Sequence, residues 1–199
     1  MQTHQKNQPQ LKTFDPIEKI GDVGVYIENC SSKEVLDEML DKITKFESSQ
    51  IRFGTRYTVH SFRSSHAAHF KSIREIMTEG ISRYLDMTGR SIADYKPAND
   101  YYAVIEWNEE RIGIHQQSIN NEGSLLIVPD ISAYLFMSDD FEGGAFNFTD
   151  LGVSIKPKAG SMIIFESDTF TSVNGIKRGG RKIEVSMPMY RADKDIELV

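Results

Sequence analysis

The sequence of 199 residues has one cysteine, no long apolar run and no excess of positive charge. Because Cys30 has no second cysteine to pair with, an internal disulfide and a zinc site of the CxxC…CxxC kind are excluded. The longest apolar runs, such as SLLIV at 124–128 and SMIIF at 161–165, are far shorter than the roughly 18 residues of a membrane-spanning helix. The formal net charge of −6 argues against a broad nucleic-acid-binding face and leaves a local basic patch open.

The polar N-terminal stretch MQTHQKNQPQLKT has no apolar core for a signal peptide, so we expect no secretion by that route. Residues 1–13 hold four glutamines and no aromatic residue, which predicts a flexible tail. We expect a single domain over 14–190 and a second, solvated tail over 191–199.

Two helices are predicted in the first half of the chain. Ser31 to Glu34 has the spacing of a capping box, and apolar residues follow at helical spacing, which predicts a helix over about 32–46. A second apolar stripe runs from Phe70 to Leu85 and is closed by Gly89. Residues 47–65 are mostly polar and lead into the second helical pattern, so the chain up to Gly89 is expected to be mostly helical.

The second half of the chain changes to the alternation of β-strands. Strand-like runs lie at 132–137, 145–148, 153–156, 161–166 and 182–187, separated by glycine, proline and aspartate clusters. A further short strand is predicted at 23–28. The pattern predicts an α+β fold, with a many-stranded antiparallel β sandwich or barrel backed by two long N-terminal helices.

One stretch carries a family resemblance. The segment YLFMSDDFEGGAFNFTDLGVSIKPKAGSMIIFES (134–167) resembles the second half of the double-stranded β-helix of the Fe(II)/2-oxoglutarate oxygenases, specifically the prolyl-4-hydroxylase-like group. The shared features are an Asp-Phe-Glu-Gly-Gly hairpin, a Lys-Pro-x-x-Gly turn and an apolar strand that ends in phenylalanine. EWNEERIGIHQQS (106–118) and VNGIKRGGRK (173–182) resemble the segments around the first and last metal ligands. The resemblance implies a double-stranded β-helix, a cupin-like jelly roll, over 101–190.

In that family an HxD pair and a distant histidine form a facial triad that holds iron and leaves positions for 2-oxoglutarate and dioxygen. The matched pair here begins at His115 and ends at Gln117, so an amide replaces the carboxylate. The distal histidine is expected six residues after Phe165 and ten before Arg181, and both counts reach Thr171. Because Gln117 and Thr171 are neutral and poor donors to a divalent ion, we expect no stoichiometric iron.

Other candidate site residues keep two interpretations each. Arg181 matches the position of the basic anchor for 2-oxoglutarate, and it also fits a turn-flanking arginine paired with a nearby acid. Tyr102, Trp107 and Tyr134 are candidates for lining a pocket, although alternating aromatic residues on strands are also typical of core packing. His115 also fits a histidine of a polar-lined interior that binds no metal.

Two functions remain open at this point. The first is a catalytically silent pseudoenzyme without a stoichiometric cofactor, acting as a binding, scaffolding or assembly module for an unidentified protein or a small dicarboxylate. The second is an active 2-oxoglutarate-dependent dioxygenase, a hydroxylase using Fe(II) and 2-oxoglutarate, in which carboxylates outside the motif join His115; the candidates are Glu109, Glu110, Asp150 and Asp168. The loss of two ligands favours the first. The resemblance is consistent with a cytoplasmic or a virion-associated protein.

Overall fold

The computed structural model describes residues 14, 16–45, 49–53, 57–62, 70–97, 102–107, 129–179 and 182–193. Its helices are α1 (Lys33–Lys45) and α2 (Lys71–Met87), with short 3-10 turns at Ile92–Asp94 and Thr149–Leu151. The strands are β1 (Ile17–Ile20), β2 (Gly24–Ile27), β3 (Ser49–Phe53), β4 (Tyr57–Phe62), β5 (Tyr95–Pro97), β6 (Tyr102–Trp107), β7 (Ile131–Phe136), β8 (Phe141–Gly143), β9 (Phe146–Phe148), β10 (Val153–Ile155), β11 (Met162–Glu166), β12 (Thr171–Val173), β13 (Ile176–Gly179), β14 (Lys182–Ser186) and β15 (Met189–Arg191).

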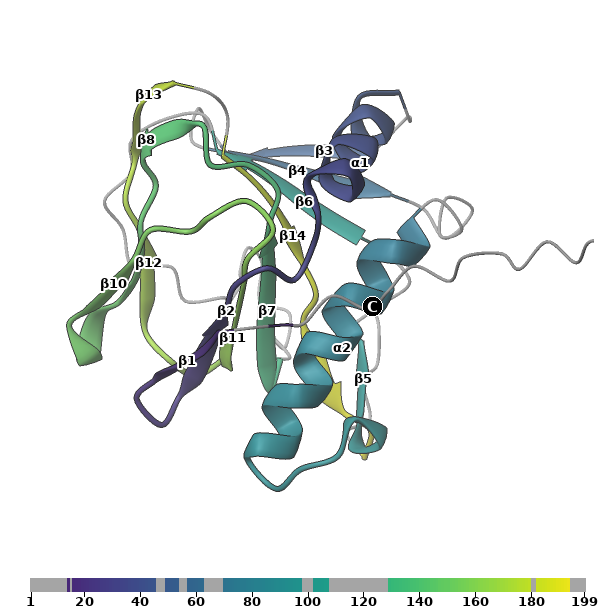
Figure 1. The fold of residues 1–199 in the computed structure, drawn as a ribbon, viewed down its shortest axis with the longest axis vertical. Helices are drawn as coiled ribbons and strands as arrows, with labels where there is room; N and C mark the ends of the chain where they lie inside the picture. Colours follow the sequence, from purple (N-terminus) through teal and green to yellow (C-terminus); the bar gives the residue numbers. More distant parts are fainter. Residues whose placement is uncertain are drawn as a thin grey trace, which may run out of the picture.

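These strands form one large and two small antiparallel sheets. The large sheet has the order β1-β2-β11-β7-β14-β6-β4-β3, and β15 joins β7 to β5 beside it. The small sheets have the order β10-β9-β12 and β13-β8. Figure 1 shows the small sheets on one side of β2, β11 and β7, and helix α2, which contacts these three strands, on the other. The described part of the chain is thus mostly β-sheet with two α-helices, which is consistent with the predicted jelly roll.

The outer face of the large sheet packs against the helices. Alternate residues of the strands lie in this outer layer because successive side chains of a strand point to opposite faces. The sheet contributes Val25, Ile27, Ala133, Leu135, Met162, Ile164, Ile183 and Val185, and the helices contribute Leu36, Met39, Ile73, Met77, Ile81, Tyr84 and Leu85. The helical stripe predicted between Phe70 and Leu85 is therefore the face that α2 buries.

The intervening residues of the same strands form an inner layer against the small sheets. Its buried members are Ile20, Tyr26, Tyr134, Phe136, Ile163 and Phe165 from the large sheet, and Phe146, Phe148 and Val173 from the small sheet β10-β9-β12. The layer is dominated by aromatic rings, which bring a large apolar area and favour tilted or edge contacts. The candidate site lies in this inner layer.

The end of α2 is built by a glycine. Gly89 has a positive φ of 73°, its N–H donates to Asp86 O at 3.1 Å and the N–H of Arg90 donates to Leu85 O at 2.8 Å. This is the Schellman arrangement, which satisfies the last carbonyls of a helix and favours glycine at the left-handed position. It directs the chain back toward the sheet and places Arg90 beside the end of β11.

One expectation is wrong. Residues 47–65 contain two strands, β3 and β4, which pair from Ser49 opposite Ser61 to Phe53 opposite Tyr57. Strand β3 ends the large sheet, whereas β4 lies between β3 and β6. The run Tyr57–Phe62 has aromatic and β-branched residues that are typical of a strand, and the polar residues around it concealed this signal.

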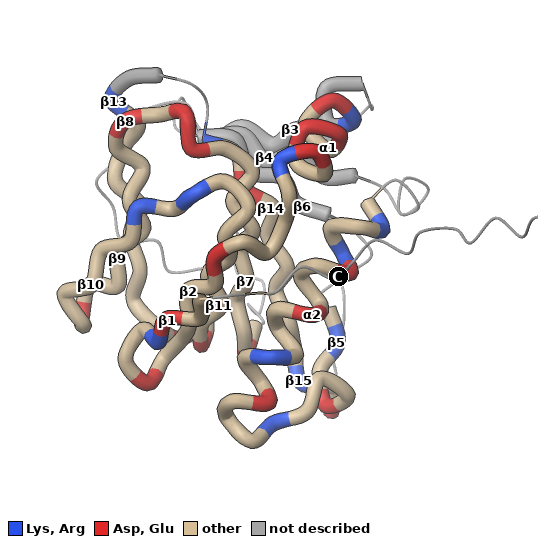
Figure 2. Tube along the Cα trace, viewed as in Figure 1, with Lys and Arg blue, Asp and Glu red and all other residues tan. Residues whose placement is uncertain are grey.

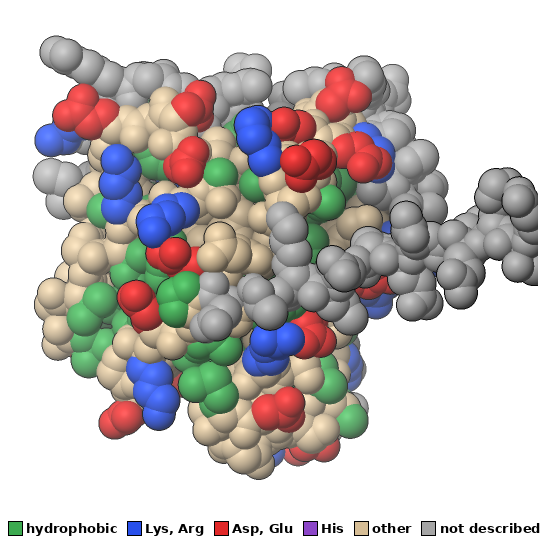
Figure 3. All heavy atoms as spheres, in the orientation of Figure 1, with side chains coloured by type: hydrophobic (Ala, Val, Ile, Leu, Met, Phe, Trp, Pro, Cys, Tyr) green, Lys and Arg blue, Asp and Glu red, His purple; other side chains and the backbone are tan. Residues whose placement is uncertain are grey.

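Charged side chains of both signs are interspersed over the described part of the chain (Figure 2). Several form pairs four residues apart on the helices, such as Lys33 with Asp37 at 2.7 Å and Arg83 with Glu79 at 2.7 Å. Figure 3 shows such charges around apolar side chains on one face of the molecule. No helix in the described ranges is long and apolar enough to cross a membrane. Exposed pairs contribute little to stability, so the two apolar layers carry the fold.

Cys30 gives a first testable prediction. The side chain is 3% exposed, its thiol donates to Ile27 O at 3.4 Å, and burial raises the pKa of this thiol to about 12. Between pH 9 and 12 the unfolded chain loses the thiol proton and the folded chain keeps it, so stability falls as the pH rises. From pH 8 to 10 the wild type should lose about 1.4 kcal/mol more than a Cys30→Ala variant in urea unfolding.

The comparison with Cys30→Ala removes the contribution of tyrosines, whose ionisation acts in both proteins. At neutral pH, iodoacetamide should label Cys30 in urea and leave it unlabelled in the native protein, because the reactive species is the thiolate. Equal pH slopes for the two proteins, or rapid native labelling, would contradict the buried position.

Candidate functional site

Thr171 occupies the first position of β12, within the inner layer. Its backbone pairs with Phe148 of β9, and Val173 pairs with Phe146. Thr171 is 3% exposed and shares its strand face with Val173, which belongs to the inner aromatic layer. The side chain at the position matched to the distal metal ligand is therefore a buried hydroxyl.

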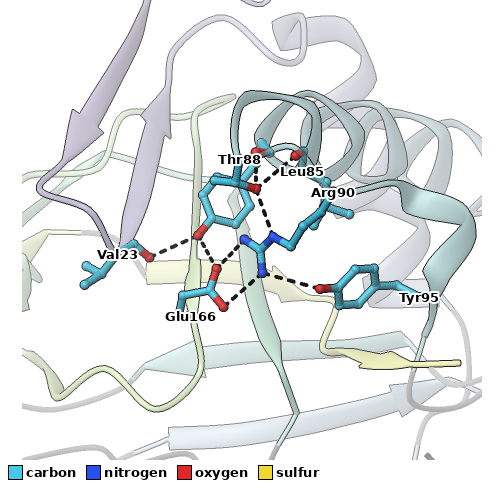
Figure 4. A network of polar contacts seen from close by, with 7 residues as sticks. Val23, Leu85, Thr88, Arg90, Tyr95 and Glu166 are labelled. Carbon is cyan, nitrogen blue, oxygen red and sulfur yellow. Dashed lines mark hydrogen bonds and ion pairs between the residues drawn. The ribbon is translucent and has the colours of Figure 1, made fainter. Parts of the chain in front are cut away.

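Hydrogen bonds hold the segment that leads into Thr171. Glu166, at the end of β11, accepts from Arg90 Nη1 at 3.2 Å and from the Tyr84 hydroxyl at 2.5 Å (Figure 4). Ser167 donates its N–H to Asp130 O at 3.0 Å. The carbonyl of Phe170 accepts from Thr149 Oγ1 at 3.0 Å. Both ends of the 167–170 connection are thus fixed to neighbouring elements.

Electrostatics reinforce the contacts of Glu166. Both terminal nitrogens of Arg90 donate hydrogen bonds to the Glu166 carboxylate, and Arg90 Nε donates to Thr88 Oγ1 at 2.9 Å (Figure 4). Burial, followed by the hydrogen bond to Glu166, raises the pKa of Tyr84 above its ordinary value. The phenol therefore remains a protonated donor at neutral pH. A planar guanidinium suits such a two-point carboxylate contact, which joins the end of α2 to the strand before Thr171.

Aromatic rings surround this part of the inner layer. Phe165 lies with its ring centroid 5.4 Å from that of Phe148, in a T-shaped contact, and 5.6 Å from that of Phe146. Tyr134 stacks on Phe165 at 6.1 Å and lies 5.8 Å from Phe146. These spacings are those of rings in mutual contact. Tyr134, a candidate for lining a pocket, thus belongs to a packed aromatic cluster that bridges the large and small sheets.

A buried ion pair lies in the same layer. Lys182 and Glu184 are 0% and 1% exposed, and Lys182 Nζ lies 2.9 Å from Glu184 Oε2. The ammonium stands 5.3 Å from the ring centroid of Phe136 and 6.0 Å from that of Phe146. Since Ile183 belongs to the outer layer, its neighbours on β14 face inward. An ammonium over aromatic faces is further stabilised by cation–π attraction.

The ion pair lies near Thr171 in the same inner layer. Lys182 approaches the ring of Phe146, whose strand partner is Val173, two residues beyond Thr171 on the same face. Two residues of a strand span about 6.7 Å. The inner layer thus holds a buried hydroxyl and a buried cation paired with a carboxylate.

The other predicted residues are distributed as follows. His115, Gln117 and Arg181 lie outside the described residues, as do Glu109 and Glu110. Tyr102 and Trp107 are described by their backbone, at opposite ends of β6, where they pair with Phe62 and Lys182. Asp150 and Asp168 are exposed. In the part of the chain that the structure describes, no three His, Cys, Asp or Glu side chains gather closely enough to hold a metal ion.

Sequence reasoning missed the buried ion pair. The strand around Lys182 and Glu184 was predicted, and its alternation of charged and apolar residues was the available signal. Such alternation is typical of a strand with one face in solvent. Here the charged face instead meets the inner layer, so the basic group that the structure places in the interior follows directly after the predicted anchor, Arg181.

The fold is shared with solved oxygenase structures. The viral collagen prolyl hydroxylase of Paramecium bursaria Chlorella virus-1, in its 2-oxoglutarate complex, superposes with a TM-score of 0.62 at 16% identity, covering 87% of this chain and 98% of that one. An oxidoreductase of the 2OG-Fe(II) oxygenase family from Burkholderia pseudomallei gives 0.60 at 14% identity, covering 87% and 86%. A Pseudomonas putida prolyl-4-hydroxylase gives 0.53 at 12% identity, covering 83% and 91%. The resemblance to Fe(II)/2-oxoglutarate oxygenases is therefore confirmed at the level of the fold.

Local sequence similarity points to the same group of proteins. Rat prolyl 3-hydroxylase 2 is 48% identical over 59 residues, or 26% of this chain and 8% of that protein. The human protein of that name is 42% identical over 74 residues, or 31% of this chain and 10% of that protein. The matches span about a tenth or less of these relatives. No family profile matches the chain.

The described residues do not fit the iron and cosubstrate of these neighbours. The spacing match to the family predicts that Thr171 stands where a triad has its distal imidazole, and the hydroxyl of Thr171 is neutral and a poor donor to a metal ion. The buried cation that would suit the far carboxylate of 2-oxoglutarate, Lys182, already contacts the carboxylate of Glu184. Neither Thr171 nor Lys182 therefore supplies the contact that iron or 2-oxoglutarate would need at its position.

Proposed function

We propose that this chain is a catalytically silent protein with the 2-oxoglutarate oxygenase fold. In this proposal a prolyl-hydroxylase-like double-stranded β-helix, backed by α1 and α2, serves as a binding, scaffolding or assembly module. The observation that carries the proposal is the buried hydroxyl of Thr171 at the position where the matched family has a metal-binding imidazole. A neutral threonine hydroxyl is a weak ligand for a divalent ion, and its burial leaves little room for a replacement ligand.

The aromatic packing around Thr171 supports the same proposal. Phe148 and Phe165 are 0% and 2% exposed and in ring contact with each other. The alternative, an active oxygenase with ligands from outside the motif, gains no support from Asp150 or Asp168, because both are exposed. An exposed carboxylate would have to leave solvent and move into the interior before it could join a ligand set there.

Metal content and turnover test the proposal together. The purified full chain is loaded anaerobically with Fe(II), desalted and measured by elemental analysis, and succinate release from 2-oxoglutarate is followed in parallel. We expect iron far below one equivalent per chain and succinate at the level of the protein-free control. An authentic prolyl hydroxylase treated in the same way shows that loading and detection work.

Near-stoichiometric iron with succinate release would overturn the proposal. The double variant Asp150→Asn/Asp168→Asn then identifies the source of the ligands among the described residues. Loss of iron and turnover in this variant would establish the active alternative with these carboxylates.

A further inference from the structure

The ion pair of Lys182 and Glu184 resembles a carboxylate bound at a buried cationic site, with the carboxylate supplied by the chain itself. The two residues lie two apart on β14 and face the inner layer, with Nζ and Oε2 at 2.9 Å and both side chains at 1% exposure or less. Phe136 and Phe146 present their rings to the ammonium from two different sheets. The cation is thus enclosed by aromatic rings, and its described anionic neighbour comes from the same strand.

Such an arrangement needs an anion. A buried ammonium loses its hydration, and a negative group within contact distance compensates much of that loss. Aromatic faces add some attraction but do not replace a counter-charge. The carboxylate of Glu184 therefore fulfils, within the chain, the role that a bound carboxylate would fulfil.

We propose that the interior of this jelly roll is a carboxylate-binding site whose occupant is the chain's own Glu184. The site takes a small monocarboxylate when that side chain is removed. This inference rests on the proposed loss of the cofactor site. It goes beyond that proposal by identifying Glu184 as the group that occupies the space beside Lys182. In the wild type the site is closed to external carboxylates because the internal one is tethered at high effective concentration.

The size of the external ligand follows from the side chain. Replacing glutamate by alanine removes a methylene and a carboxylate, which are the atoms of acetate. In Glu184→Ala, acetate matches the space left by the removed side-chain atoms and can contact the ammonium of Lys182. Acetamide has the same shape without the charge, and Glu184→Gln keeps the space filled without the charge.

The test is a thermal unfolding series of the full chain at pH 7, with sodium acetate against sodium chloride at equal ionic strength. For Glu184→Ala we expect a melting temperature that rises with acetate, by about 3–6 °C when acetate exceeds its Kd tenfold. The wild type, Glu184→Gln and the double variant Lys182→Met/Glu184→Ala should show no rise specific to acetate. The double variant is the matched control, because it has the cavity without the cation.

Three results would overturn the inference. The first is the absence of a specific acetate effect on Glu184→Ala. The second is an effect of acetamide as strong as that of acetate, which would mean that filling a cavity is sufficient. The third is a specific effect that persists in Lys182→Met/Glu184→Ala, which would show that Lys182 is not the binding partner.

Refolding keeps the test decisive if Glu184→Ala is too unstable for melting curves. The variant is diluted from urea into acetate, acetamide or chloride, and the soluble folded fraction is measured. A larger yield in acetate supports the inference, and equal yields overturn it. The outcome is separable from that of the proposed function, because iron content and succinate release are measured on the wild type and do not depend on acetate rescue.

Discussion

Replacing either member of the buried pair alone is expected to lower the free energy of unfolding by about 3–5 kcal/mol. Lys182→Met leaves a carboxylate, and Glu184→Leu leaves an ammonium, in an interior where both side chains are at most 1% exposed. The double variant Lys182→Met/Glu184→Leu removes both charges and should be far more stable than the sum of the single losses predicts. Urea unfolding of the four proteins at pH 7 gives the coupling energy directly.

The exposed pair of Lys33 and Asp37 on α1 is the control. Its charged atoms lie at 2.7 Å, but the side chains are 81% and 55% exposed, so solvent screens the interaction. The cycle of Lys33→Ala, Asp37→Ala and the double variant should show no resolvable coupling. Additive losses at Lys182 and Glu184 would contradict the buried contact and remove the basis of the acetate site.

Elements with a strong apolar pattern could be predicted from the sequence. The stripe of α2 buries one face of the helix, and the strand β11, expected at 161–166 and observed at Met162–Glu166, is an apolar run buried on both faces. Packing of apolar residues, rather than intrinsic helix or strand propensity, contributes most of the stability of such elements. The strands β3 and β4 were not predicted, because the polar residues of 47–65 interrupt the apolar periodicity, although Tyr57–Phe62 has the aromatic and β-branched residues of a strand.

The candidate site was predictable only in part, for a related reason. Alternation identifies the two faces of β14, but it does not say whether the face with Lys182 and Glu184 meets water or a second sheet. That depends on where the small sheets pack, and those sheets pair residues distant in sequence, such as Thr171 with Phe148. The importance of Thr171 came from its spacing to Phe165 and Arg181, and its burial required the structure.

Phe165→Ala is expected to lower the free energy of unfolding by about 3–5 kcal/mol, the usual loss for a large aromatic side chain in a packed core. Phe165 is 2% exposed and meets Tyr134, Phe146 and Phe148 at ring spacings of 5.4–6.1 Å. Removing it leaves these rings without a partner across the two sheets, and the rigid strands on either side limit how far they can close. Chemical unfolding in urea, with the slope compared to that of the wild type, measures the loss.

Phe170→Ala is the matched control, since it makes the same substitution five residues away at a side chain that is 42% exposed. Its effect should stay within about 0.5 kcal/mol, as is usual for surface positions. The contrast bears on function as well as stability. A loss for Phe165→Ala as small as that for Phe170→Ala would mean that the rings do not fill the interior beside Thr171. The interior would then have room for a cosubstrate, and the packing argument for a silent site would fail even if the fold stood unchanged.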